Sequence, residues 1–125
     1  MNIKKNMIIT IDGPSGAGKS TIAKLLAGTT GYTYIDSGAI YRGIAYAYKT
    51  RKNNESIEDL LPVIALAFEF GDNTRVVFGD ADISEEIRKP DISLLASSLS
   101  QIQPVRDYAN ALQRELGREG RVVLE

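Results

Sequence analysis

The chain has 125 residues, 43% of them hydrophobic and 25% charged, which is ordinary usage for one compact globular unit. Its 15 Lys and Arg against 16 Asp and Glu give a net charge of −1, so no general basic surface exists for a nucleic acid polymer. The absence of Cys and His excludes disulfides, zinc–thiolate sites, cysteine nucleophiles and the usual general base at neutral pH. Its chemistry must rest on Lys, Arg, carboxylates, hydroxyls and the backbone.

A short buried β-strand is predicted at 7–11, where apolar and β-branched residues run together as in a parallel strand covered on both faces. Two lysines precede this run, as in a secretory signal, but the run already ends at Asp12. No stretch approaches the roughly 20 apolar residues that a membrane span needs. We therefore expect a cytoplasmic protein without a membrane partner.

Residues 13–20, GPSGAGKS, match the phosphate-binding P-loop pattern Gly-x-x-x-x-Gly-Lys-Ser/Thr between a strand and a helix. Glycines let successive N–H groups converge on an anion, and the following helix adds its positive end. We expect Lys19 to reach the β and γ phosphates and the Ser20 hydroxyl to bind Mg²⁺. The predicted nucleotide-binding residues are Gly13, Ser15, Gly16, Ala17, Gly18, Lys19, Ser20 and Thr21.

The helix that begins near Lys19 is expected to bury Ile22, Leu25 and Leu26 on one face and to end at Gly28. A second strand is predicted at 32–35. It leads into the sequence DSGAIYR at 36–42 and a helix that continues to residue 49. That helix carries three large apolar residues at helical spacing, Ile40, Ile44 and Tyr48.

The middle of the chain mixes helix and strand signals. Ser56 and the acidic residues after it indicate a helix start, but Pro62 requires that helix to kink or to begin later. Aromatic and β-branched runs separated by Gly-Asp pairs predict a β-rich insertion with a small hairpin between Phe68 and Arg88.

Two further helices are expected to begin at Asp91 and Pro104, and the second ends at Gly117. Its apolar stripe consists of Val105, Tyr108, Ala109, Leu112 and Leu116. A last strand is predicted at 121–125. The ligands of open α/β sheets bind at the carboxyl ends of their strands. Because the sequence stops where this strand reaches that edge, we expect a truncated chain.

Four stretches resemble, in order, signatures of the bacterial cytidylate kinase family: IDGPSGAGKS, YIDSGAIYR, DISEEIR and SSLSQIQPVR. The resemblance covers residues 7–125, and DSGAIYR and Val105-Arg106 are more selective than the P-loop. It implies an α/β fold, namely a P-loop nucleoside monophosphate kinase core with a parallel sheet, helices on both faces and a small β-rich acceptor-binding insertion. One truncated kinase domain would span 1–125, with an acceptor-binding region at about 36–106 and without the C-terminal lid and last strands.

The resemblance also implies roles for the residues that bind the acceptor phosphate. Ser37 and Arg42 would contact it, and Asp36 and Tyr41 would shape the same pocket. A guanidinium suits this task because its planar fork can bind two phosphate oxygens. Lys19 and Arg42 would be the catalytic side chains.

Ser97 and Arg106 match family positions that hydrogen-bond the cytosine ring. An arginine supplies donors for O2 and N3 of cytosine, and a serine oxygen can accept from its amine. Residues 82–88 resemble the segment that leads out of the acceptor-binding insertion. We assign Arg88 no ligand contact and expect it to pair with neighbouring acidic residues.

The implied reaction transfers the γ-phosphoryl group of Mg-ATP to CMP or dCMP, giving ADP and CDP or dCDP, in pyrimidine nucleotide metabolism. An acceptor phosphate is already a nucleophile, so no histidine base is needed. The family continues after such a last strand with a Gly-Arg-Asp motif and an arginine-bearing lid. We therefore expect this chain to be nearly inactive alone, and the complete enzyme to be a monomer. The alternatives are another P-loop enzyme, such as a small-molecule kinase or a GTPase, and a noncatalytic nucleotide-binding fragment.

Overall fold

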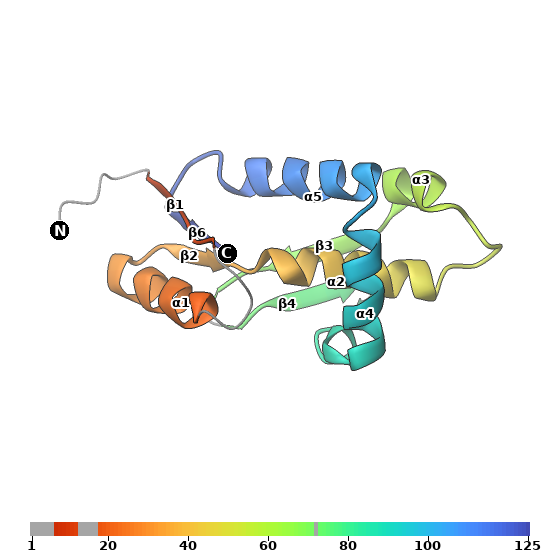
Figure 1. The fold of residues 1–125 in the computed structure, drawn as a ribbon, viewed down its shortest axis with the longest axis horizontal. Coiled ribbons are helices and arrows are strands. Elements are labelled where there is room, and N and C mark those ends of the chain that lie inside the picture. Colours follow the sequence, from red (N-terminus) through yellow and green to blue (C-terminus); the bar gives the residue numbers. More distant parts are fainter. Residues whose placement is uncertain (1–6, 13–17, 72) are drawn as a thin grey trace.

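The computed structural model describes residues 7–12, 18–71 and 73–125 (Figure 1). Three short strands form a parallel sheet in the order β1-β6-β2: β1 (Ile8–Thr10), β6 (Val122–Leu124) and β2 (Thr33–Ile35). Ile9 and Tyr34 both pair with Val123, which is completely buried in the central strand. The strands predicted at the start, the second position and the end of the sequence are thereby confirmed.

Helices lie on both sides of this sheet. Figure 1 shows α1 (Lys19–Thr30) below it and α5 (Gln103–Leu116) above it. The expected end of α1 at Gly28 is wrong, because the helix continues to Thr30 and stops at Gly31, whose φ of 74° is left-handed.

The apolar face predicted for α1 is also wrong in part. Ile22 and Leu25 are 49% and 69% exposed, whereas the small residues Ala23 and Ala27 are buried. Both alanines pack with Tyr34 and Val123 of the sheet. Small side chains therefore bring α1 close to the sheet, which an apolar pattern dominated by large residues did not indicate.

The central helix α2 (Ser37–Lys49) packs against α4 (Pro90–Leu99), α5 and the insertion. Ile40 and Ile44 are fully buried and Tyr48 is partly buried, as the helical spacing predicted. Gly43 lies where α2 meets Phe68, since a Cβ atom at Gly43 would be 3.2 Å from that ring. Helices α4 and α5 begin within a residue of their predicted starts, and α5 ends at Leu116, directly before the predicted stop Gly117.

The β-rich insertion is an antiparallel sheet in the order β3-β4-β5, with one short strand more than the predicted hairpin. The strands are β3 (Leu66–Glu69), β4 (Arg75–Phe78) and β5 (Ala81–Asp82). Arg75 bonds Asp82 at 3.0 Å and Glu69 at 3.2 Å across this sheet. Hydrogen bonds from Ser84, together with Arg75, lower the pKa of Asp82 to about 2.

The segment before the insertion resolves the question that Pro62 raised. Helix α3 (Ile57–Leu60) begins where the capping pattern predicts, and Ser56 accepts a hydrogen bond from the Asp59 N–H at 3.1 Å. The chain then tightens into a 3₁₀ turn, Leu61–Val63, which accommodates the proline near its start.

Two hydrophobic clusters hold the described residues together. The larger one joins α2, α3, α4, α5 and the insertion, and the smaller one consists of Ala23, Ala27, Tyr34 and Val123. Across 7–12, 18–71 and 73–125, no helix has the length and apolar character required to span a bilayer.

Candidate functional site

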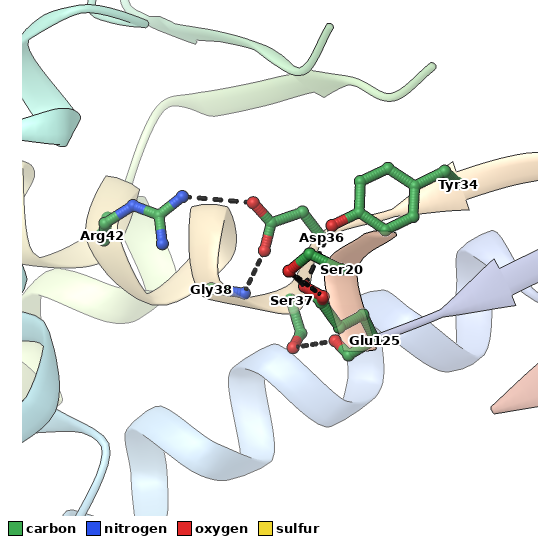
Figure 2. Close-up of polar contacts among 7 residues, drawn as sticks. All are labelled: Ser20, Tyr34, Asp36, Ser37, Gly38, Arg42 and Glu125. Carbon is green, nitrogen blue, oxygen red and sulfur yellow. Dashed lines mark hydrogen bonds and ion pairs between the residues drawn. The ribbon is translucent and has the colours of Figure 1, made fainter. Parts of the chain in front are cut away.

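The carboxyl ends of β2 and β6 meet at one edge of the parallel sheet and bring Asp36, Ser37 and Glu125 together (Figure 2). The Glu125 N–H donates to the carbonyl of Ile35 at 3.1 Å. In return, the carbonyl of Glu125 accepts from the Ser37 N–H at 3.3 Å and from the Ser37 hydroxyl at 2.5 Å. Backbone pairing with β2 therefore fixes the position of Glu125.

The Glu125 carboxylate accepts hydrogen bonds from two hydroxyl groups. Ser20, in the first turn of α1, donates to its two oxygens at 2.9 and 2.5 Å. Tyr34, the central residue of β2, donates to Oε1 at 2.9 Å. Burial raises the pKa of Tyr34 above its ordinary value, and Asp36 and Glu125 act in the same direction, so the phenol remains a donor.

A hydroxyl and a carboxylate in contact are ligands suited to Mg²⁺, a hard cation that prefers oxygen. Among the described residues, no group of three or more acidic, His or Cys side chains gathers as a metal-binding cage. Mg²⁺ usually needs only one or two carboxylates, because waters and substrate phosphates fill its other positions. Ser20 and Glu125 therefore fit this ion. The P-loop pattern predicted Ser20 as a metal ligand, and the place of Glu125 at the end of a strand indicated an acidic residue near the metal.

The structure describes part of the P-loop. Gly13, Ser15, Gly16 and Ala17 lie outside the described residues. Gly18 precedes α1 with a left-handed φ of 75°, and the partly buried Lys19 and exposed Thr21 lie in the first turn of the helix. The positive end of α1 is thus at the same sheet edge as Glu125, through Ser20.

Asp36 and Arg42 form the second part of the site. Asp36 caps α2 by accepting from the Gly38 N–H at 2.9 Å, and its other oxygen binds the Arg42 guanidinium at 3.2 Å. Both side chains are partly exposed, at 24% and 27%. The remaining N–H groups of Arg42 have no bonded partner among the described residues, so they are available to an anion.

A pocket of about 80 Å³ opens beside this ion pair, and Tyr34 forms part of its wall. Lys24, Arg42 and Arg88 line it with one carboxylate, Asp36, which leaves two positive charges in excess. Lys24 also lies 5.7 Å from the centre of the Tyr34 ring. Neither Lys24 nor Arg88 forms an ion pair with another described residue. The pocket therefore suits an anion with two negative charges.

The expectation that Arg88 pairs with neighbouring acidic residues is wrong. Glu86 pairs instead with Lys89, at 2.7 Å, and Arg88 follows the buried Ile87 in a 3₁₀ turn that faces the pocket. Lys24 was missed as well. No local pattern points to either residue, because the fold brings the turn and α1 to the same place.

The remaining predicted site residues lie apart from this pocket. Tyr41 is partly buried against the larger hydrophobic cluster. Ser97 on α4 and Arg106 on α5 are exposed, and the described residues that line the pocket do not include them. Ser97 uses its carbonyl to accept from the Ser100 hydroxyl at 2.7 Å. The roles of these three residues stay predictions.

Comparisons with known proteins agree with this geometry. A family model for cytidylate kinase matches residues 9–125. A cytidylate kinase of Chlorobaculum tepidum is 40% identical over 98% of this chain and 54% of its own length, and one of Geobacter sulfurreducens is 42% identical over the same shares. A third, of Caldicellulosiruptor bescii, is 40% identical over 97% of this chain and 56% of its own length. The chain spans about half the length of these curated relatives.

Proposed function

The chain belongs to the cytidylate kinase family, and on this basis we propose that it provides the ATP-phosphate and acceptor-phosphate sites of a kinase for CMP or dCMP. One observation carries the proposal: Tyr34 lines the cationic pocket and also binds Glu125, which accepts a hydrogen bond from the P-loop serine Ser20. A donor phosphate at the P-loop and an acceptor phosphate in the pocket would be neighbours.

The charge of the pocket supports a nucleoside monophosphate as the acceptor. A phosphate monoester carries close to two negative charges at neutral pH. Three cations and one carboxylate match that charge. Arg42 would bind two phosphate oxygens and Ser37 would also contact the phosphate, while Asp36 would form part of the pocket wall. Arg88 and Lys24 would contribute charge.

In the proposed reaction an oxygen of the acceptor phosphate forms a bond to the γ-phosphorus of ATP, and the bond from that phosphorus to the β–γ bridging oxygen breaks. ADP leaves with the electron pair. Lys19 and the positive end of α1 would stabilise the negative charge of the donor phosphates, while Arg42 aligns the acceptor. Mg²⁺, when bound by Ser20 and Glu125, would neutralise charge on the β and γ oxygens. The acceptor needs no general base.

The cytosine ring would be read by Ser97 and Arg106, and the acceptor-binding region would extend over about 36–106, within one kinase domain. We further propose a monomeric and cytoplasmic enzyme. Because the chain spans about half the length of its relatives, we expect it to bind both nucleotides but to transfer phosphoryl groups slowly or not at all.

Calorimetric titration of CMP, dCMP, UMP and AMP into the chain tests the acceptor site, with Arg42→Ala beside Arg114→Ala, an exposed arginine of α5. A hydrogen bond to a charged group is worth about 1.5–3 kcal/mol, so Arg42→Ala should weaken CMP binding roughly tenfold or more. Arg114→Ala should leave it unchanged. An ADP-formation assay on the same samples, with Lys19→Ala as the control, should give background with every acceptor.

The proposal is wrong if CMP fails to bind more tightly than AMP or if Arg42→Ala leaves CMP binding intact. Turnover stimulated by CMP would support the assignment and contradict the expected inactivity of the chain alone. Nucleotide binding at the P-loop without any acceptor binding would favour a noncatalytic nucleotide-binding protein.

A further inference from the structure

We propose that Tyr34 is a positioning residue for magnesium: its hydroxyl holds the Glu125 carboxylate in the orientation that Ser20 and Mg²⁺ require. This inference rests on the proposed function, because it concerns the donor-phosphate side of the same site. Tyr34 is the first residue of the YIDSGAIYR stretch, but none of the site roles predicted from the sequence was given to it.

The backbone of Glu125 is fixed, but its side chain is not. Pairing with Ile35 and Ser37 determines where the residue begins. A glutamate side chain still has three rotatable bonds, and only hydrogen bonds hold the carboxylate at its far end. Among the described residues these bonds come from Ser20 and Tyr34.

Tyr34 is the rigid partner of the two. It is 6% exposed, and its ring packs in the smaller cluster with Ala23, Ala27 and Val123. Its hydroxyl can therefore donate from one position only, and Figure 2 shows it pointing at the Glu125 carboxylate from the side opposite Arg42. Ser20, in contrast, is exposed in the first turn of α1.

The phenol of Tyr34 binds one oxygen of the Glu125 carboxylate and leaves the other to Ser20 and a cation. Tyr34 binds only Oε1, whereas the shorter contact of Ser20, 2.5 Å, is to Oε2. With Oε1 bound by the phenol, Oε2 lies next to the serine oxygen. Two oxygen ligands would then be preorganised for one Mg²⁺.

The consequence is measurable without catalysis. Groups that orient a metal ligand typically contribute 10–100-fold to metal affinity. Loss of the Tyr34 hydroxyl should reduce the gain in nucleotide affinity that Mg²⁺ provides by about tenfold. Binding of the same nucleotide in EDTA should not change, because Tyr34 does not belong to the P-loop.

The experiment measures the affinity of a fluorescent N-methylanthraniloyl ATP in EDTA and in saturating Mg²⁺. It compares the wild-type chain, Tyr34→Phe, Glu125→Gln and the double variant. Tyr108→Phe is the matched control, because Tyr108 is a partly buried tyrosine in the larger cluster whose hydroxyl has no hydrogen-bonding partner among the described residues. We expect Tyr34→Phe and Glu125→Gln each to lose the magnesium gain, and the double variant to lose no more than Glu125→Gln alone.

Several results would overturn the inference alone: Tyr34→Phe keeps the full magnesium gain, the wild-type chain binds nucleotide without any magnesium gain, or Tyr34→Phe weakens binding equally in both media. Equal weakening would mean that Tyr34 only supports the fold, and additive losses in the double variant would mean that it acts without Glu125. A wild-type chain that binds no nucleotide in either medium overturns the proposed function and this inference with it.

Discussion

A side chain at position 38 would collide with the guanidinium of Arg42. A Cβ atom on Gly38 would lie 2.6 Å from a terminal nitrogen of Arg42 and 3.1 Å from Oδ1 of Asp36. The end of an arginine side chain is flexible, so the guanidinium would move and the helix would stay. Gly38 therefore permits the ion pair between Arg42 and Asp36 beside the cationic pocket.

Gly38→Ala should weaken CMP binding about tenfold, since the displaced guanidinium loses charge-assisted hydrogen bonds to the phosphate. The melting temperature should not fall, because alanine is favoured over glycine within a helix by about 1 kcal/mol. Calorimetry and thermal unfolding check the two statements. Unchanged CMP affinity, or a loss of affinity that follows a loss of stability, would contradict this account.

Individual residues of the site differ in how far the sequence could identify them. Asp36, Ser37 and Arg42 are close in sequence, so one motif predicted all three, and their joint position at a strand end follows from the parallel sheet. Arg88 and Lys24 reach the same pocket from a 3₁₀ turn and from α1. Their contribution depends on long-range packing, which no local pattern records.

Close packing between α2 and β3 sets the position of the insertion. Phe68 of β3 lies against Gly43, where a Cβ atom would be 3.2 Å from the ring, whereas a Cβ at Gly28 in α1 would meet nothing within 4 Å. Both glycines are inside helices and have ordinary helical backbone. They therefore form a matched pair in which only the neighbouring element differs.

Gly43→Leu should destabilise the chain by about 1–3 kcal/mol or more, because overpacking forces side chains and backbone apart. Gly28→Leu should be neutral or slightly stabilising, since leucine forms helices better than glycine. Urea unfolding followed by circular dichroism checks both. Equal effects of the two substitutions would show that β3 does not pack closely on α2.

Local signals predicted the elements better than they predicted the faces. Caps, prolines and glycines placed most helix ends within a residue or two, because these residues act on the adjacent backbone. Gly28 failed as a stop because Gly31, three residues on, provides the left-handed conformation. The buried face of α1 failed because tertiary contact with Tyr34 selected alanines over larger residues.

Two hydrophobic clusters of unequal size divide the molecule. The larger spans α2, α3, α4, α5 and the insertion. The smaller supports α1 and the parallel sheet with few and mostly small side chains, and Ile8 at the sheet edge is 49% exposed. Among the described residues, the part around α1 and the parallel sheet therefore buries less apolar surface than the part around α2.

Amide hydrogen exchange should reflect this division. Peptides of α1 should exchange at least roughly tenfold faster than peptides of α2, because regions with few buried contacts open at lower free energy. ATP with Mg²⁺ should slow exchange in α1, since a ligand that binds only the folded state stabilises it. Equal protection of both helices would mean that the two clusters unfold together.

The sequence by itself determined the P-loop, the order of strands and helices, the family resemblance and the charged motif at the end of the second strand. These depend on spacing and on local backbone chemistry, which short stretches specify. Tertiary structure alone decided that Glu125 binds Ser20 and Tyr34, and that Lys24 and Arg88 join Arg42 around one pocket. Those side chains come from distant segments, and only the parallel sheet and the folded insertion bring them within contact distance.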